Sequence, residues 1–237
     1  AADQNKGRIC NIVHVGAPTT ERSVNLARHA AESGAEAICC VPPFFYSQKD
    51  EAIVDHYKAV AEAANLPFYV YNLPQSTGVE ITVDLMAKIR DSVPQLAGLK
   101  HSSINFQNVR EWERMDLNCF IGSSMLMLPA LTLGAIGCID GPPCAAPELW
   151  VDIWNHWKNG NIEEAMKAQK KASLFTEIMR EVGVHSGTKA VLSERLGIDC
   201  GSGRLPNPPL EGSDREYVLN KVRALGIEKI TAIASGD

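Results

Sequence analysis

Short apolar segments alternate with amphipathic segments along most of this chain. The segments that we expect to be strands are Ile9–Val15, Ala37–Val41, Phe68–Tyr71, Leu96–Lys100, Cys119–Gly122 and Ala135–Ile139. Strands that are apolar on both faces and are joined by helices are typical of a parallel sheet with helices packed against it. This alternation limits the possible folds more than any other feature of the sequence.

Helical patterns lie between and after these strands. The expected helices are Pro18–Ala31, Gln48–Ala64, Thr82–Asp91, Asn105–Arg114, Met125–Leu133, Pro147–Lys158, Ile162–Val182, Thr188–Leu196 and Asp214–Leu225. No strand pattern follows Gly160, and a loop rich in glycine and proline spans Cys200–Pro209. We therefore predict a partial (β/α)8 barrel over residues 1–160 and a helical extension over residues 161–237 that packs on the barrel.

The short, regular units and the polar residues at successive strand ends favour an α/β fold of the (β/α)8 TIM-barrel type. A doubly wound open sheet is the alternative, but no Gly-x-Gly-x-x-Gly turn follows the first strand. We count six βα units in the sequence, whereas a closed barrel has eight. On this interpretation the first two units are absent, and the chain starts in the helix before the third strand.

Composition narrows the possible partners. The chain has 237 residues and a formal net charge of -5, with 45% hydrophobic and 22% charged residues and no basic stripe. We therefore expect no nucleic-acid or membrane partner. No apolar run approaches the roughly 20 residues that span a bilayer. The polar residues 1–8 do not resemble a signal peptide, so we predict a cytoplasmic protein.

The seven cysteines show neither a Cys-x-x-Cys pair nor a zinc-binding spacing with histidine. Cys39, Cys40, Cys119 and Cys138 lie in apolar segments. We interpret the cysteines as reduced core thiols and predict no metal site. A redox or nucleophilic cysteine is the alternative, although the sequence indicates no histidine partner near any of them.

Lys100 and Tyr71 are the candidate catalytic residues. In a barrel the carboxyl ends of the strands face one site, and these two residues end neighbouring strands. A lysine amine in a partly apolar environment is well suited to attack a ketone and form a Schiff base. A phenol beside it can exchange a proton with a substrate hydroxyl. The alternatives are a lysine that only reaches solvent and a tyrosine that only caps its strand.

Other polar residues at the strand ends have structural alternatives. Asp140 follows an apolar run, where a carboxylate needs a partner or caps the next loop. Asn72 and Thr77 suit a turn. His14 and His101 lack metal-ligand spacing and are interpreted as structural or supporting residues. The glycine-rich loop at residues 201–204 does not join a strand to a helix, so we expect no phosphate site there.

At these strand ends the chain resembles the N-acetylneuraminate lyase and dihydrodipicolinate synthase family of class I, Schiff-base-forming aldolases. The resemblance extends through about Leu225. The matching pieces are His14–Ala17, Val41–Phe45, Tyr71–Pro74 with Thr77–Gly78, Gly98–Lys100, Gly122 and Gly134–Ile139. It implies a (β/α)8 barrel with a C-terminal helical extension and a homotetramer or another homo-oligomer. It also implies a small-molecule 2-keto acid as substrate and no cofactor.

The resemblance assigns roles to individual residues. It implies that Lys100 forms the Schiff base with pyruvate or another 2-keto acid, that Tyr71 relays protons, and that the backbone carbonyl of Ile139 lines the pyruvate pocket. A retro-aldol step then breaks a carbon–carbon bond while the iminium accepts the electrons. The substrate-binding residues expected on this basis are Ile139, Gly122, Ser76, Thr77, Ser124, Asp140, Phe45 and Tyr46.

Several positions depart from the family pattern. The Gly-Thr-Thr-Gly-Glu turn that binds the keto-acid carboxylate is absent from the sequence. Ser76 stands where the synthase branch has an arginine for a second carboxylate. Ser124 and Met125 stand where the sialic acid branch has an Asp-Glu pair, and Asp140 replaces a small residue. Phe45, followed by Tyr46, stands where a tyrosine relays protons across a subunit boundary.

The favoured hypothesis is a lyase of the N-acetylneuraminate lyase type that acts through a lysine Schiff base on a 2-keto acid. A dihydrodipicolinate synthase is the alternative within the family, as is a 2-keto-3-deoxy sugar acid aldolase or dehydratase, in which Asp140 would bind a polyol. A truncated, non-catalytic homologue is the alternative from another class, because missing units would leave open strand edges. A metal-dependent barrel aldolase has the least support, since no ligand cluster is evident.

Overall fold

The computed structural model describes residues 2–230 of the chain. Contacts between Cα atoms group the chain into two compact units. The first unit contains Ala1–Gly122 and Ala130–Gly137, and the second contains Ser123–Pro129 and Cys138–Asp237. The predicted domain boundary at residue 160 stays a prediction.

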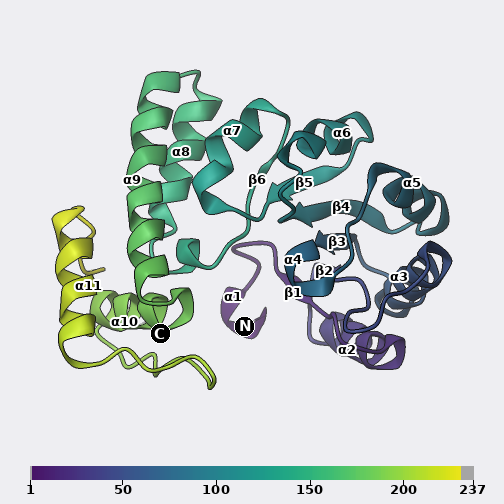
Figure 1. Cartoon of the computed structure of the whole chain (residues 1–237), viewed down its shortest axis with the longest axis horizontal. Helices are drawn as coiled ribbons and strands as arrows, with labels where there is room; N and C mark the ends of the chain where they lie inside the picture. The colour runs from purple at the N-terminus through teal and green to yellow at the C-terminus, as the bar shows by residue number, and fades with distance from the viewer. Residues whose placement is uncertain (1, 231–237) are drawn as a thin grey trace. The chain divides into compact units, whose positions relative to one another are not determined.

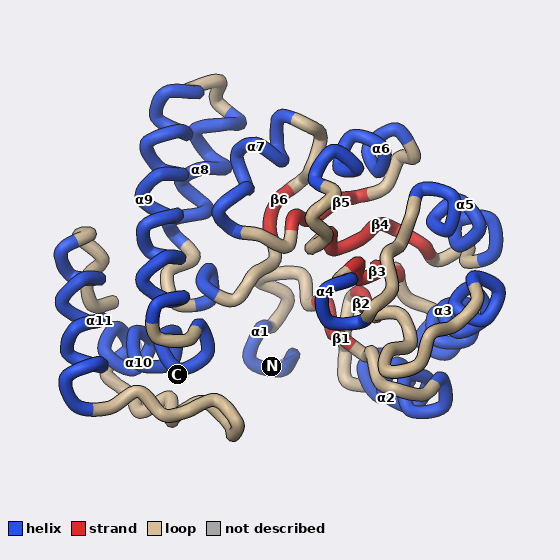
Figure 2. The backbone as a smooth tube through the Cα atoms, in the orientation of Figure 1, coloured by secondary structure: helices blue, strands red, loops and turns tan. Residues whose placement is uncertain are grey.

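A six-stranded sheet has the order β1-β2-β3-β4-β5-β6, and its strands β1 to β5 form the centre of the first unit (Figures 1 and 2). The strands are β1 (Ile12–His14), β2 (Ala37–Cys40), β3 (Phe68–Asn72), β4 (Leu96–His101), β5 (Asn118–Ile121) and β6 (Gly137–Cys138). Strands β1 to β5 pair in parallel, each with its neighbour in the sequence. All six predicted strands are therefore confirmed.

The consecutive strand order excludes the doubly wound alternative, in which the strand order reverses at a switch point. It agrees with the barrel prediction, but residues 2–230 contribute six strands, and closure into eight units is not shown.

Strand β1 begins at Ile12 rather than at the predicted Ile9. The side chain of Asn5 forms hydrogen bonds with both the N–H and the carbonyl oxygen of Ile9. These backbone groups of Ile9 are therefore bonded to the preceding helix and not to a neighbouring strand.

The helices of the first unit begin at residues that suit helix starts. Thr19 and Thr82 cap two of them by accepting hydrogen bonds from backbone N–H groups. The helices are α1 (Ala2–Asn5), α2 (Thr20–Glu32), α3 (Asp50–Ala64), α4 (Pro74–Thr77), α5 (Val83–Ser92), η1 (Phe106–Asn108) and α6 (Val109–Arg114). Helix α7 (Met127–Thr132) begins in the second unit and ends in the first. The sequence missed the short helix α4, which lies inside the expected loop after β3.

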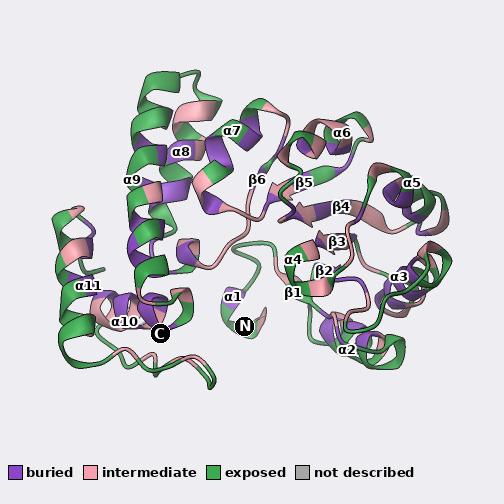
Figure 3. Ribbon diagram, in the orientation of Figure 1, coloured by how far each residue is buried: buried purple, intermediate pink, exposed green. Residues whose placement is uncertain are grey.

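Helices α2, α3 and α5 lie along one side of the strands (Figure 1). Their inner faces are buried, as Figure 3 shows in purple. The core combines strand and helix residues that are almost fully enclosed: Ile38, Phe68, Leu99, Ile121, Ile53, Tyr57, Met86, Ile89 and Trp112. Burying an apolar side chain of this size stabilises the fold by about 1.5–3 kcal/mol. The carboxyl ends of the strands are therefore positioned by a well-packed core.

The second unit is helical. Its elements are η2 (Ser124–Leu126), η3 (Pro142–Cys144), α8 (Glu148–Lys158), α9 (Ile162–Glu181), α10 (Val184–Leu196) and α11 (Gly212–Ala224). Helices α8 and α9 lie side by side, and the rings of Trp150 and Phe175 pack edge to face with centroids 6.2 Å apart. The buried guanidinium of Arg195 donates to the carbonyl oxygens of Ala145 and Glu228.

Helix α10 begins at Val184, four residues before the predicted start at Thr188. Gly187 in its first turn weakens the helical signal. A Cβ atom on Gly187 would lie 3.0 Å from Val182 Cγ2 and 3.3 Å from the sulfur of Met179. The glycine thus permits a close approach to α9, which local propensity cannot reveal.

No helix within residues 2–230 is long and apolar enough to cross a lipid bilayer.

Candidate active site

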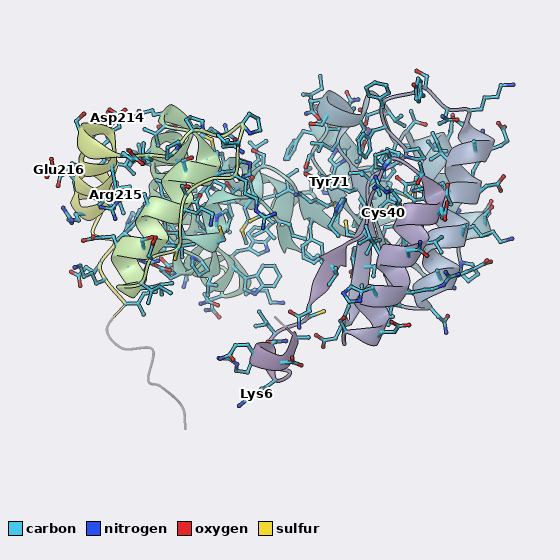
Figure 4. All side chains as sticks on the ribbon, turned by 90° about the horizontal axis from the view of Figure 1, so that it is seen from below. Lys6, Cys40, Tyr71, Asp214, Arg215 and Glu216 are labelled. Atoms are coloured by element: carbon cyan, nitrogen blue, oxygen red, sulfur yellow. The ribbon has the colours of Figure 1, made fainter. Side chains whose placement is uncertain are left out.

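Lys100 and Tyr71 lie opposite each other on two paired strands. The register of β3 and β4 places Tyr71 beside Lys100 and Asn72 beside His101. Lys100 Nζ lies 4.1 Å from the centroid of the Tyr71 ring. A cation within about 6 Å of an aromatic face is attracted by the ring. Both side chains are half-buried, and Figure 4 labels Tyr71 on the strand-bearing unit. The structure thus brings the two predicted catalytic residues together.

Gly98 determines how closely β5 approaches the lysine strand. A Cβ atom at position 98 would lie only 2.1 Å from the backbone oxygen of Asn118. Only glycine leaves room for that oxygen, so the close pairing of β4 and β5 depends on it. Because Gly98 precedes Lys100 by two residues on the same strand, it helps to set the path that carries the amine.

His101 has a structural role next to Lys100. Its ring is fully buried, and Trp112 Nε1 donates to His101 Nδ1 over 3.3 Å. His101 Nε2 lies 3.1 Å from the backbone oxygen of Asn105, so this nitrogen carries the proton. Burial is the main cause that lowers the pKa of His101. A neutral imidazole with a hydrogen bond at each ring nitrogen holds the backbone in place directly after Lys100.

Asn72 and Glu80 connect the loops that follow β3 and β4. Asn72 is fully buried; its Oδ1 accepts from the N–H of Ile81 over 3.1 Å, and its Nδ2 donates to Glu80 Oε1 over 2.9 Å. Glu80 Oε2 accepts from Ser103 Oγ over 2.8 Å. One carboxylate therefore ties together the chain segments beside Tyr71 and Lys100. Glu80 was not predicted from the sequence, because its partners are 8 and 23 residues away.

A cavity of about 300 Å³ lies beside Tyr71. We call it the Tyr71 cavity; its lining residues are His14, Gly16, Val41, Phe44, Tyr71, Leu73, Ser76 and Thr77. The wall is formed by the carboxyl ends of β1 and β3 and by the segments that follow β1, β2 and β3. Lys100 is not among the lining residues.

His14 and Gly16 shape one wall of the Tyr71 cavity. The His14 ring stands perpendicular to the Tyr71 ring with centroids 6.0 Å apart. Desolvation by the surrounding protein, and next the charge on Lys100, lower the pKa of His14. A Cβ atom on Gly16 would come within 2.6 Å of Val41 Cγ2 and 2.8 Å of the His14 ring, so glycine keeps this wall compact.

The other predicted site residues of the first unit have different surroundings. Ser76 and Thr77 line the Tyr71 cavity, whereas Phe45 and Tyr46 do not. Phe45 and Tyr46 are 85% and 72% exposed, and Phe45 has a φ of 84°, which is strained for a bulky residue. The backbone N–H of Gly122 donates to the carbonyl oxygen of His101 over 2.7 Å.

Ser124, Ile139 and Asp140 belong to the second unit. Asp140 Oδ2 accepts from the backbone N–H of Ser124 over 2.9 Å, and Oδ1 accepts from the N–H of Gly141 over 2.7 Å. The bond to Gly141 fits the alternative in which Asp140 caps the next loop. Ser124 is buried, and Ile139 is half-buried.

The prediction that no cysteine has a histidine partner is wrong for Cys40. Cys40 Sγ lies 3.6 Å from His56 Nε2, and His56 Nδ1 lies 2.9 Å from Thr20 Oγ1. Burial raises the pKa of the Cys40 thiol and lowers the pKa of His56 to about 4. Both shifts favour the neutral forms, so this contact does not activate the thiol.

Cys39, Cys40 and Cys119 are buried as predicted, whereas Cys138 and Cys200 are half-buried. The core assignment is wrong for Cys10 and Cys144, which are exposed. Within residues 2–230, no group of three or more His, Cys, Asp or Glu side chains is placed to hold a metal ion.

Comparison with known proteins adds a family match. The model of the dihydrodipicolinate synthetase family matches residues 1–225. An N-acetylneuraminate lyase of Rhizobium meliloti is 32% identical over 210 residues, which cover 88% of this chain and 69% of that protein. A 4-hydroxy-tetrahydrodipicolinate synthase of Rhizobium meliloti is 30% identical over 225 residues, which cover 93% of this chain and 76% of that protein.

A solved structure of a sialic acid aldolase from Ruminococcus gnavus superposes with a TM-score of 0.86 at 30% identity. The superposition covers 93% of this chain and 75% of that chain. The sequence matches and the structural match therefore agree on one group of lyases and synthases.

Proposed function

The chain belongs to the dihydrodipicolinate synthetase family of lyases, and on this basis we propose that it cleaves or forms a carbon–carbon bond through a Schiff base on Lys100. The observation that carries the proposal is the distance of 4.1 Å between Lys100 Nζ and the centroid of the Tyr71 ring. An amine and a phenol on paired strands are the two groups that such a reaction needs.

The proposed reaction starts when the ammonium group of Lys100 gives its proton to solvent, because only the neutral amine can attack a carbonyl. The amine attacks the ketone carbon of a 2-keto acid, and loss of water gives an iminium. Tyr71 gives its phenol proton to the departing water, and the resulting phenolate then accepts the proton of the C4 hydroxyl while the C3–C4 bond breaks. The electron pair of that bond moves into the iminium and forms an enamine, and an aldehyde leaves. Protonation of the enamine at C3 and hydrolysis release the shortened keto acid and restore the amine.

The network around Asn72, Glu80 and His101 supports this chemistry by holding the backbone next to both groups. Precise positioning contributes to rate because reacting groups must meet in one geometry. The family resemblance implies that the backbone carbonyl of Ile139 lines the pocket for the keto-acid end, and the substrate-binding roles of Gly122, Ser124 and Asp140 stay predictions. Pyruvate as the keto acid, a homotetramer or another homo-oligomer, and a cytoplasmic location remain predictions.

Trapping with borohydride tests the proposal. The protein is incubated with pyruvate and sodium borohydride, and the modified peptide is identified by mass spectrometry. We expect one reduced pyruvate adduct on Lys100. The Lys100→Met variant should give no adduct. Lys88→Ala is the matched control, because Lys88 is exposed and pairs with Asp50. An unmodified wild-type protein, or equal labelling of Lys100→Met, contradicts the proposal.

The variant Tyr71→Phe separates the contribution of the Tyr71 hydroxyl from that of the Lys100 amine. This variant keeps the ring beside Lys100 but loses the hydroxyl, so the adduct should still form while turnover falls by about 10²–10⁴-fold. Turnover equal to that of the wild type would remove Tyr71 from the proposed mechanism.

A further inference from the structure

The Tyr71 cavity has no charged wall. None of its lining residues is an aspartate, glutamate, lysine or arginine. The single titratable wall residue near neutral pH is His14, whose lowered pKa leaves its imidazole uncharged at pH 7 and above. A carboxylate that entered this cavity would lose hydration without gaining a cationic partner from the wall.

The hydrogen-bonding side chains of the cavity wall are those of His14, Tyr71, Ser76 and Thr77. Val41, Phe44 and Leu73 are apolar, and the Oγ1 atom of Thr77 already lies 2.9 Å from the Leu73 carbonyl oxygen and 3.3 Å from the N–H of Val79. Ser76 is an exposed residue. A polyhydroxylated chain would therefore leave several hydroxyls without partners when water is displaced, which weakens its binding.

The position of the cavity assigns it to one end of the substrate. Tyr71 lines the cavity, and the amine of Lys100, which does not line it, lies against the same ring. In the proposed reaction the keto carbon is bonded to Lys100, and the C4 oxygen exchanges its proton with Tyr71. The fragment that leaves as the aldehyde therefore extends beyond Tyr71, into the cavity.

We propose that the aldehyde formed or consumed by this enzyme is uncharged and mainly apolar, of the size of a small aromatic or branched aliphatic aldehyde. A cavity of roughly half this volume is enough for benzene. The proposal rests on the proposed Schiff-base function. In the direction of synthesis, C3 of the enamine attacks the aldehyde carbon, and the carbonyl oxygen takes the phenol proton.

A panel of aldehydes tests the preference. The full chain is incubated with pyruvate and, in turn, benzaldehyde, isobutyraldehyde, N-acetylmannosamine and succinic semialdehyde, and the 4-hydroxy-2-keto acids are measured by chromatography with mass spectrometry. We expect kcat/KM to be at least about tenfold higher for the first two aldehydes, the order of discrimination that an apolar pocket supplies. A higher kcat/KM for N-acetylmannosamine or succinic semialdehyde overturns the proposal, even when the pyruvate adduct on Lys100 forms.

Two variants examine the wall directly. Leu73→Asp places a carboxylate in the cavity and should lower kcat/KM for benzaldehyde by about tenfold or more. Ile9→Asp is the control, because Ile9 is 70% exposed and does not line the cavity. Ser76→Arg places a cation there and should shift the preference towards succinic semialdehyde. Unchanged preferences in both cavity variants contradict the assignment.

A binding measurement tests ligand binding in the cavity independently of Schiff-base formation on Lys100. Saturation-transfer NMR with benzyl alcohol and with erythritol needs no adduct on Lys100. We expect a signal for benzyl alcohol on the wild type that falls in Leu73→Asp and persists in Ile9→Asp, and a weaker signal for erythritol. A missing signal, or one that Leu73→Asp leaves unchanged, overturns the apolar subsite. Failure of borohydride trapping with the expected NMR result refutes the Schiff-base function alone.

Discussion

Acidification should destabilise the first unit through His56. The His56 side chain is 2% exposed, packs beside Cys40 and Thr20, and has its pKa lowered by burial from 6.5 to about 4. Between these two values the unfolded chain binds a proton that the folded chain does not. Stability is therefore fully present above about pH 6.5 and is lost as the pH falls towards 4.

The size of this effect follows from the shift. A difference of about 2.5 units between 6.5 and 4, at about 1.4 kcal/mol per unit, gives a loss of about 3.5 kcal/mol at the acidic limit. Between about pH 7.5 and pH 5, the same two values give a loss of about 2 kcal/mol. For a protein with an unfolding free energy of about 5–15 kcal/mol, this change is large enough to measure.

Urea unfolding followed by circular dichroism at the two pH values gives the measurement. Other groups also titrate in this range, so the relevant quantity is the difference between the wild type and His56→Gln, which removes the titration. We expect the wild type to lose about 2 kcal/mol more than His56→Gln on acidification. His29→Gln is the control, because His29 is exposed on α2. Equal pH dependence in the wild type and His56→Gln would refute the reasoning.

Two further substitutions test the framework of the site. Gly98→Ala should lower the free energy of unfolding by about 1–3 kcal/mol or more, because its Cβ atom would overlap the Asn118 oxygen. Gly137→Ala is its control in thermal unfolding, since a Cβ atom there meets Phe120 at 3.5 Å, and equal losses would contradict the steric argument. Asn72→Ala leaves Glu80 with fewer partners and should cost about 1–3 kcal/mol. It should also slow pyruvate trapping on Lys100 under folded conditions, whereas an unchanged trapping rate would show that Asn72 serves stability alone.

The order of elements and the pairing of Lys100 with Tyr71 were predictable because they follow from local patterns. An apolar run of four to six residues between helices indicates a buried parallel strand, and consecutive units place consecutive strands side by side. Once β3 and β4 are neighbours, residues at their carboxyl ends must meet. The differences from the family pattern at Ser76, Ser124 and Met125 were also visible in the sequence, because they concern only which amino acid stands at a given position.

The contacts between distant residues were decided by tertiary structure. Cys40 meets His56 16 residues later, and Glu80 joins Asn72 to Ser103 across two loops. Neither contact leaves a periodic signal, because each depends on how a helix or loop packs against the sheet. The exposure of Cys10 and Cys144 and the early start of α10 likewise depend on packing.

The sequence by itself thus determined the strand order and the amine–phenol pair, since hydrophobic periodicity encodes burial and strand succession. It did not determine the neutral wall of the Tyr71 cavity. That wall combines residues at or after the ends of three different strands, and its polarity depends on which side chains turn inwards and which are already bonded. Only the folded chain brings these groups together, because the burial and hydrogen bonds that set their chemistry arise from contacts far apart in the sequence.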